Sequence, residues 1–196
     1  MRIPRVHGII RRRLLVNFRV DPDLIQVILP SPFRPKLQDG YAIAGICLIR
    51  LEHIRPKPLP WLLGVSSENA AHRIAVQWDG KEGVYIPRRD TGSLMNHLAG
   101  GRLFPGEHHR ARFRVAETDD AIELFMDSAD EKVKVEISAS VTSDLPRSSV
   151  FPTLADASSF FEGGSLGYSA TAEGNRLDGV TLKTREWKVE PCKTKQ

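Results

Sequence analysis

The sequence predicts a mainly β fold, a closed or partly closed antiparallel barrel with a few short helices. Three observations predict it. Short apolar or alternating segments recur along the chain and are typical of β-strands. Asp-Gly pairs at residues 39–40 and 79–80 mark tight turns between such segments. Helix signals are few and brief, and the 196 residues are expected to form one domain over residues 1–196.

The first half of the chain begins with a strand and a short helix. Residues 8–20 hold the basic triplet Arg11-Arg12-Arg13, and their second half reads as a strand. Residues 21–30 carry Asp at the N-cap, Pro at the first helical position and Pro at the end, which predicts a helix. Residues 41–51 are apolar on both faces, so we expect a central strand there.

A proline-rich stretch follows the central strand. Residues 55–64 contain three prolines and the apolar sequence Trp61-Leu62-Leu63. Because proline lacks an N–H donor, we expect a long loop with an apolar tip. Three roles are open for this loop: it packs on its own barrel end, covers a pocket or docks on a second subunit.

A hairpin is expected over residues 66–87, and a helix capped by Ser93 over residues 93–99.

The second half predicts a meander and a further short helix. Residues 110–115, 122–126 and 132–141 alternate in polarity or run apolar, which indicates three antiparallel strands with one face in water. A helix is expected over residues 153–162, before Gly163-Gly164. The last strands are expected at residues 166–169 and from 180 to 189.

Composition excludes several classes of protein. Hydrophobic residues make up 41% of the chain and charged residues 27%, which is ordinary globular usage. Cys47 and Cys192 are isolated, so neither a structural zinc site nor an oxidising compartment is indicated. No run approaches the ~18 apolar residues of a membrane span. We therefore expect a cytoplasmic protein without a membrane partner. The net charge of +4 is small and does not favour nucleic acid as a partner.

Strong catalytic motifs are missing from the sequence. It contains no GxSxG elbow, phosphate loop, HExxH or dinucleotide glycine pattern. We therefore predict no cofactor and no metal site. The one metal-binding combination worth testing would join Glu68, His72 and either His108 or His109.

Residues 100–110 form the first candidate site. They hold three glycines, which allow sharp bends of the backbone. They also hold Arg102, Glu107, His108 and His109, whose side chains are of the types that bind anions and transfer protons. If the strand begins before the two histidines, they point to opposite faces, so at most one of them faces inward. Arg102, Glu107 and His108 are therefore candidate ligand-binding residues, with His108 also a candidate acid or base.

Glu68 and His72 form the second candidate pair. They share one face of a predicted strand, whereas Arg73 faces the other way. A carboxylate and an imidazole on one wall would exchange protons with a ligand, which makes Glu68 a candidate catalytic residue. A structural pair without a chemical role carries equal weight.

Several short motifs occur in an order that points to a known family. In chain order they are Val20-Asp21-Pro22-Asp23-Leu24, Leu29-Pro30, Asp39-Gly40-Tyr41-Ala42, Glu68-Asn69 with Arg73, Gly83-Val84-Tyr85, Gly101-Arg102, Phe160-Phe161-Glu162-Gly163-Gly164, Gly167-Tyr168-Ser169, Gly179 and Trp187. With these motifs the chain resembles an uncharacterised bacterial family of unknown function that is similar to acetoacetate decarboxylase. The resemblance implies a cone-shaped antiparallel barrel with an interior pocket for a small carboxylate or ketone.

The resemblance does not extend to the decarboxylase lysine. That enzyme carries a Gly-Arg-Glu element and then a Pro-Lys-Lys element, whose lysine forms a Schiff base with the substrate. Here Gly101-Arg102 precedes Leu103, and no lysine lies between Lys81 and Lys132. Schiff-base decarboxylation is therefore not expected. Arg102 matches the family position and is the expected anion anchor.

The structural alternative for Arg102 is an ion pair with Glu68 or Glu107. Two hypotheses about the function of the chain follow. In the first, the barrel binds a small anionic or carbonyl-bearing molecule, and Glu68 or His108 performs acid–base chemistry. In the second, the chain is a non-catalytic interaction module that contacts a protein or nucleic acid through its proline-rich loop and arginine-rich edge. A homo-oligomer is compatible with both hypotheses.

Overall fold

A computed structural model describes residues 6–57, 59–94, 97, 106–171 and 176–194. Its elements follow one another along the chain. The first half contains β1 (Val6–Val20), α1 (Pro22–Ile28), β2 (Arg34–Pro35), β3 (Leu37–Gln38), β4 (Tyr41–Pro56), the 3-10 helix η1 (Trp61–Leu63), β5 (Val65–Trp78) and β6 (Lys81–Thr91). The second half contains β7 (His108–Glu117), β8 (Ala121–Ser128), β9 (Lys134–Val141), α3 (Leu154–Glu162), η2 (Gly163–Ser165), β10 (Leu166–Ala170), β11 (Leu177–Thr181) and β12 (Cys192–Thr194).

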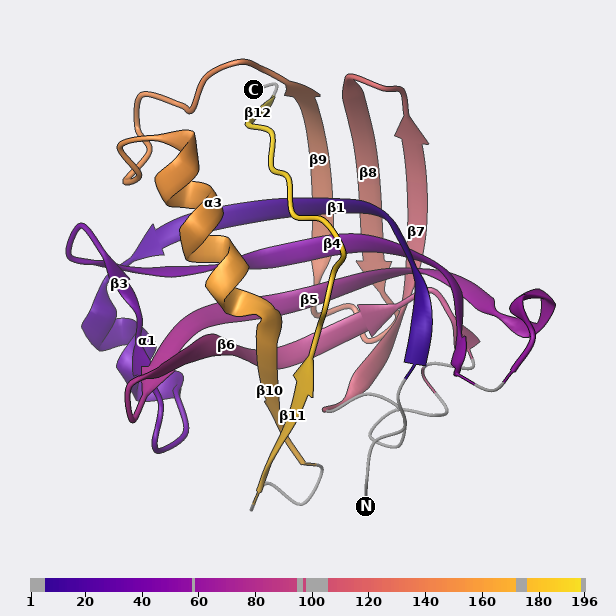
Figure 1. Cartoon of the computed structure of the whole chain (residues 1–196), viewed down its shortest axis with the longest axis horizontal. Helices are drawn as coiled ribbons and strands as arrows, with labels where there is room; N and C mark the ends of the chain where they lie inside the picture. The colour runs from indigo at the N-terminus through magenta and orange to yellow at the C-terminus, as the bar shows by residue number, and fades with distance from the viewer. Residues whose placement is uncertain (1–5, 58, 95–96, 98–105, 172–175, 195–196) are drawn as a thin grey trace.

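The described strands form one curled sheet with the order β1-β4-β5-β6-β7-β8-β9-β12. In Figure 1, strands β1, β4, β5 and β6 run across the view, and the β7–β9 meander crosses behind them. This arrangement is a half-barrel, which confirms the predicted mainly β, partly closed barrel. The pairing is mixed, however, because β6 runs parallel to both β7 and β10. Local alternation predicts strands but not the direction of a distant partner.

Two layers cover the curled sheet on opposite faces. On one face, which we call the meander face, Leu48 and Ala70 pack against Leu124 and Met126 of β8. On the other face, which we call the α3 face, Ile43 and Ala75 pack against Phe160 of α3. Figure 1 shows α3 lying across β1, β4 and β5 in front of the sheet. Because side chains alternate along a strand, neighbouring residues of β5 belong to different layers.

The helices begin where their sequence signals predict. Asp21 accepts a hydrogen bond from the backbone N–H of Asp23, and α1 buries Ile25 against the sheet. Thr153 and Asp156 form a reciprocal capping box at the start of α3, which buries Ala157 and Phe160. None of the described helices has the length and apolarity that a membrane crossing requires.

Of the other local predictions, some are confirmed and some are wrong. The central strand, the hairpin at residues 79–80 and the meander are confirmed as β4, β5–β6 and β7–β9. The proline-rich loop is shorter than predicted, because β4 continues to Pro56 at the end of its ladder and η1 fills the turn. Residues 182–191 form no strand, and most of the helix predicted over residues 93–99 lies outside the described residues.

Candidate functional site

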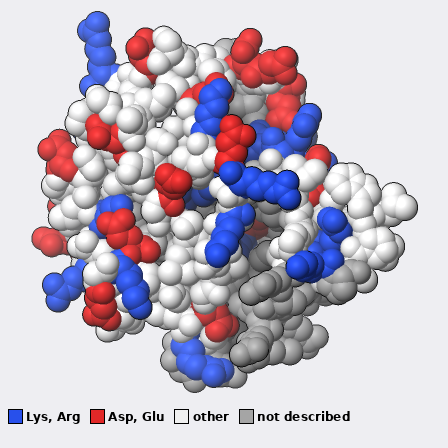
Figure 2. All heavy atoms as spheres, in the orientation of Figure 1, with Lys and Arg blue, Asp and Glu red and all other residues white. Residues whose placement is uncertain are grey.

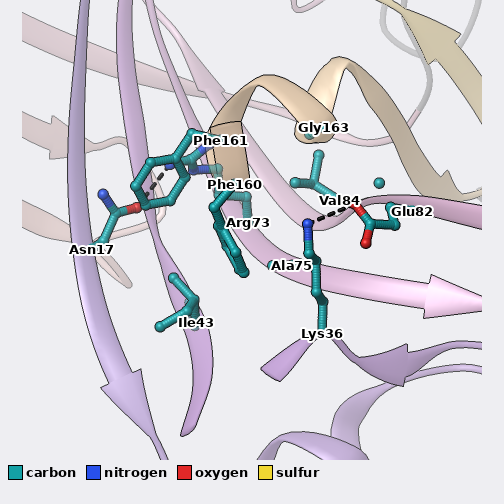
Figure 3. Close-up of a pocket in the computed structure, with 13 residues that line it drawn as sticks. Asn17, Lys36, Ile43, Arg73, Ala75, Glu82, Val84, Phe160, Phe161 and Gly163 are labelled. Atoms are coloured by element: carbon teal, nitrogen blue, oxygen red, sulfur yellow. Dashed lines mark hydrogen bonds and ion pairs between the residues drawn. The ribbon is translucent and has the colours of Figure 1, made fainter. Parts of the chain in front are cut away.

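A recess opens between the α3 face of the sheet and α3 itself (Figure 3). The centre of a water molecule can occupy about 10 Å³ of it, which is room for about one water molecule. The recess including its open mouth has about 330 Å³. It is lined by Asn17, Lys36, Ile43, Ala44, Arg73, Ala75, Glu82, Gly83, Val84, Phe160, Phe161, Gly163 and Gly164.

Arg73 lies at the base of this recess. It is only 6% exposed, although it sits in the middle of β5. Its Nη2 donates a hydrogen bond of 2.7 Å to Oδ1 of Asn17 on β1, and its guanidinium lies 5.1 Å from the centre of the Phe161 ring. In the part of the chain that the structure describes, no carboxylate forms an ion pair with Arg73. A buried guanidinium with these neutral partners keeps donors for an anion.

Burial is the main electrostatic influence on Arg73. Desolvation lowers the pKa of its guanidinium to about 10, the net value after an opposing effect of Cys47 and a smaller lowering by the positive charge of Arg13. The group is still charged at neutral pH. A buried cation without an acidic partner is energetically costly, and an anion bound beside it would offset that cost.

The walls of the recess are apolar and its mouth carries an ion pair. Figure 3 shows the rings of Phe160 and Phe161 above the sheet. At the mouth, Lys36 Nζ lies 2.6 Å from Glu82 Oε2 and 4.3 Å from the centre of the Phe160 ring. An amine nucleophile must be neutral, whereas an ion pair with a carboxylate favours the ammonium form. The geometry therefore gives Lys36 no support as a Schiff-base lysine.

A second arginine, half-buried, lies near Arg73 on the α3 face. Arg89 of β6 pairs in register with Ala71, two residues before Arg73. Its Nη2 lies 3.4 Å from Ser169 Oγ of β10, and burial lowers the pKa of its guanidinium to about 10. Gly106 lies against Ser169 with a φ of +82°, and a Cβ there would fall 2.6 Å from the Cβ of Ser169. A side chain at this position would clash with Ser169, so the close approach requires glycine.

His108 lies opposite Arg89 in the parallel β6–β7 register. Its Nδ1 is 3.2 Å from the carbonyl oxygen of Gly106. Burial, and secondarily the charge of Arg89, lower the pKa of His108 to about 4, so its imidazole is neutral at pH 7. His109 points the other way, toward Asp130, as the alternation of the strand predicts.

The lowered pKa of His108 predicts a loss of stability in weak acid. Between pH 6.5 and about 4 the unfolded chain binds a proton on His108 that the folded chain does not, so the free energy of unfolding should fall as the pH falls. The loss from this group is at most about 3 kcal/mol. His108→Gln should remove it, whereas the matched change at the exposed His7 should not. Urea unfolding at pH 7 and pH 5 measures both, and equal pH dependence of wild type and His108→Gln would contradict the expectation.

Glu68 lies on the meander face, away from Arg73. Its carboxylate is 2.5 Å from Arg12 Nη2 and 3.5 Å from Arg50 Nη1, and its side chain is largely buried. Arg12 also binds Glu117, so this cluster links β1, β4, β5 and β7. Glu68 is therefore the central carboxylate of an ion-pair network that links these strands. The catalytic role predicted for Glu68 stays a prediction.

His72 shares the meander face with Glu68, as predicted, but joins a different cluster. Its Nε2 lies 3.2 Å from Oδ2 of Asp90, which is fully buried and accepts three further hydrogen bonds from Nε and Nη2 of Arg88. Burial alone would raise the pKa of Asp90, but the hydrogen bonds from His72 and Arg88 outweigh it and lower that pKa. Arg88 also binds Asp130 in the β8–β9 turn, and Asp130 lies 3.5 Å from Nδ1 of His109. The ligand-binding role predicted for His72 is likewise untested.

The remaining predicted residues are placed apart from the recess or cannot be placed. Glu107 is mostly exposed and lies 3.8 Å from His109. Arg102 lies outside the described residues, so its role as anion anchor stays a prediction. Within the described ranges, no three His, Cys, Asp or Glu side chains are grouped to hold a metal ion. The structure thus brings neither Glu68 nor His72 to the recess.

Sequence reasoning missed the residues that form the recess. The sequence places Arg73 in a family motif and on the face opposite Glu68 and His72, but it indicates no binding role for Arg73, Asn17 or Lys36. The available signal was the position of Arg73 within the apolar run of β5, where a charged residue breaks the pattern of the α3 face. Its contact with Asn17 joins residues 56 positions apart, which the sequence alone does not reveal.

Comparison with known proteins identifies a family for this sequence. The profile of the DUF2071 family, described as an uncharacterized conserved protein, matches residues 9–195. The comparison with curated protein sequences gave no match.

The fold is similar to solved structures of acetoacetate decarboxylase and related enzymes. Acetoacetate decarboxylase from Legionella pneumophila subsp. pneumophila str. Philadelphia 1 superposes with a TM-score of 0.62 at 15% identity, covering 98% of this chain and 73% of that one. An acetoacetate decarboxylase-like enzyme from Sphingomonas wittichii RW1 gives 0.56 at 13% identity, over 86% and 69%. The enduracididine biosynthesis enzyme MppR, complexed with pyruvate, gives 0.51 at 15% identity, over 81% and 61%. The fold implied by the sequence resemblance is thereby confirmed.

Proposed function

Because the chain belongs to the DUF2071 family and has an acetoacetate decarboxylase-like fold, we propose that it binds a small carboxylate, with or without an adjacent carbonyl, in the recess above Arg73. The observation that carries this proposal is the burial of Arg73 beside the neutral Asn17, with no ion-paired carboxylate in the described ranges. Pyruvate, the molecule bound to the similarly folded MppR, belongs to this chemical class.

The recess suits a short acid better than a long one. A guanidinium binds a carboxylate through two parallel hydrogen bonds, and the amide of Asn17 adds a neutral polar group at the same depth. The walls of Ile43, Ala75 and Phe160 would contact a short carbon chain. Because the recess has room for about one water molecule, we expect Phe160 and Phe161 to move outward when a three-carbon acid binds. Binding is therefore coupled to a shift of α3.

Acid–base chemistry is the reaction type that these residues favour. His108 is the predicted acid or base on the α3 face, where it lies across from Arg89 in the β6–β7 register. Its imidazole is neutral at pH 7, which is the form of a base, and its lowered pKa makes that base a weak one. Amine catalysis by Lys36 has no such support, because its Nζ is paired with Glu82. The roles predicted for Arg102, Glu107, Glu68 and His72 are not needed for binding at Arg73.

The arginine-rich edge gives the nucleic-acid alternative little support. Arg12 is ion-paired with Glu68 and Glu117, and Arg13 lies 5.2 Å from the centre of the Trp187 ring. Of this triplet, only Arg11 is exposed. Side chains committed to partners within the protein are not available to phosphates.

Calorimetric titration with matched acids and amides tests the proposal. We expect propionate and pyruvate to bind and propionamide not to bind, because the amide has the same shape without the charge. Intrinsic fluorescence or hydrogen exchange of α3 should change with the acids alone. Equal binding of acid and amide, or no binding of any small carboxylate, would contradict a carboxylate site at Arg73.

A further inference from the structure

The hairpin that joins β4 to β5 ends in an exposed apolar surface. Leu59, Trp61, Leu62 and Leu63 are all exposed, and Leu62 is 87% exposed. We call these four residues the tip. In Figure 1 this hairpin extends to one end of the long axis of the molecule, and Figure 2 shows it projecting from the surface with Lys and Arg atoms beside it. Apolar groups gathered on a projecting loop are typical of a contact surface.

The shape of the tip is fixed by contacts within the hairpin. The rings of His53 and Trp61 stack with their centres 3.6 Å apart. Arg55 donates hydrogen bonds to the carbonyl oxygens of His53 and Leu59, and its guanidinium lies over the Trp61 ring. The leucines are therefore held outward by a preformed turn, which lowers the entropic cost of binding a partner.

A second exposed apolar surface lies at the opposite end of the molecule, on α1. Leu24, Val27 and Ile28 are exposed with the helical spacing of one stripe, and Val27 is 85% exposed, while Ile25 is buried against the sheet. Exposed Leu37 and Tyr41 belong to the neighbouring β3–β4 hairpin. We call the stripe on α1 the platform. A groove lined by Arg19, Asp21, Pro22, Asp39, Gly40 and Tyr41 lies next to it.

The two surfaces carry opposite charges. Residues 53–67, which include the tip, contain Arg55 and Lys57 and no acidic residue. Around the platform, Asp21, Asp23 and Asp39 are exposed, and none of them forms an ion pair within the described ranges. Arg19 lines the same groove, where its guanidinium lies over the Tyr41 ring, so these three acidic groups outnumber it. Two tips facing each other would bring like charges together, and so would two platforms. The favoured contact is therefore between a tip and a platform.

We propose that the tip of one copy of this chain docks on the platform of a second copy. Because the two surfaces lie at opposite ends of the molecule, the contact is heterologous, and repeated contacts build a ring or a filament. The apolar centres of the two surfaces supply the buried area. Lys57 of one copy and Asp23 of the next supply complementary charges at the rim.

Light scattering after size exclusion, over a range of concentrations, measures the assembly. Wild type should self-associate, and the tip variant Leu62→Glu and the platform variant Val27→Glu should each be monomeric. An equimolar mixture of the two variants should form a dimer and nothing larger, because one tip and one platform remain intact between them. The control Leu182→Glu adds the same charge at an exposed leucine on neither surface and should assemble like wild type.

A charge exchange gives an independent readout. Lys57→Glu and Asp23→Lys should each weaken association at least tenfold, and the double variant should recover most of it. Three outcomes would overturn the proposal: a wild type that is monomeric at every concentration, assembly by either Leu62→Glu or Val27→Glu alone, or a mixture of the two variants that stays monomeric.

Binding to vesicles of phosphatidylcholine with phosphatidylglycerol provides the last comparison. Wild type that binds them through Leu62 but never self-associates would assign the tip to a membrane surface and overturn the proposal.

Discussion

Replacing Arg73 by methionine is expected to abolish the binding of small carboxylates without destabilising the protein. A charge-assisted hydrogen bond contributes roughly 1.5–3 kcal/mol, so the loss of the guanidinium should weaken binding at least tenfold. The unliganded fold should gain up to about 3 kcal/mol, because burial that lowers the pKa of Arg73 to about 10 disfavours the charged form at neutral pH. Titration calorimetry and urea unfolding measure the two effects.

Two further variants make the Arg73 experiment specific. Arg73→Lys keeps the charge but not the planar pair of donors, so it should bind carboxylates more weakly than wild type. Arg112→Met removes an exposed arginine of β7 and should change neither affinity nor stability. Arg73→Met with wild-type affinity would exclude this guanidinium as the anchor. A loss of more than about 2 kcal/mol in stability would instead indicate a structural role.

Asp90→Asn is expected to cost about 3–5 kcal/mol of stability, because it removes the buried carboxylate that pairs with Arg88 and His72. Asparagine keeps the shape but not the charge. Since the pKa of Asp90 is lowered in the folded state, its contribution is present above the unfolded pKa of about 4 and is lost as the pH falls through the folded value. Urea unfolding at pH 7 measures the full effect, and the difference between wild type and variant should shrink in strong acid.

An exposed pair provides the control for Asp90. Glu190 binds Lys188 at 3.0 Å, and both side chains are mostly in water. Glu190→Gln should therefore change the stability by less than about 1 kcal/mol. If Asp90→Asn costs no more than Glu190→Gln, the cluster of Asp90, Arg88 and His72 does not hold the sheet together as the structure indicates.

Local signals were sufficient for most of the fold. The N-cap Asp21, the Asp79-Gly80 turn and the alternation along β9 each depend on a few neighbouring residues, and each placed its element. The parallel pairing of β6 with β7 was not predictable in this way. The strand direction depends on the path of the long connection between β6 and β7. The alternation of polar and apolar residues is the same for a parallel and an antiparallel partner.

The site was harder to predict, because its members are scattered. Glu68 and His72 were chosen for their chemistry, but their partners Arg12 and Asp90 lie 56 and 18 residues away and occupy both side chains. Arg73 was assigned correctly to the opposite face. The recess on that face is formed by α3, which places Phe160 and Phe161 above the sheet. This helix lies some 80 residues after Arg73 in the sequence.

The parallel seam between β6 and β7 has a consequence for how the molecule folds and fluctuates. It comprises three residue pairs, from Arg89 with His108 to Thr91 with Arg110, whereas the strand pairs on either side have long antiparallel registers. The meander is therefore a local unit of low contact order, able to form early and to open on its own. Beyond that seam, its attachment to β1, β4, β5 and β6 depends on the packing of Leu124 and Met126 and on the ion pairs Arg88–Asp130 and Arg12–Glu117.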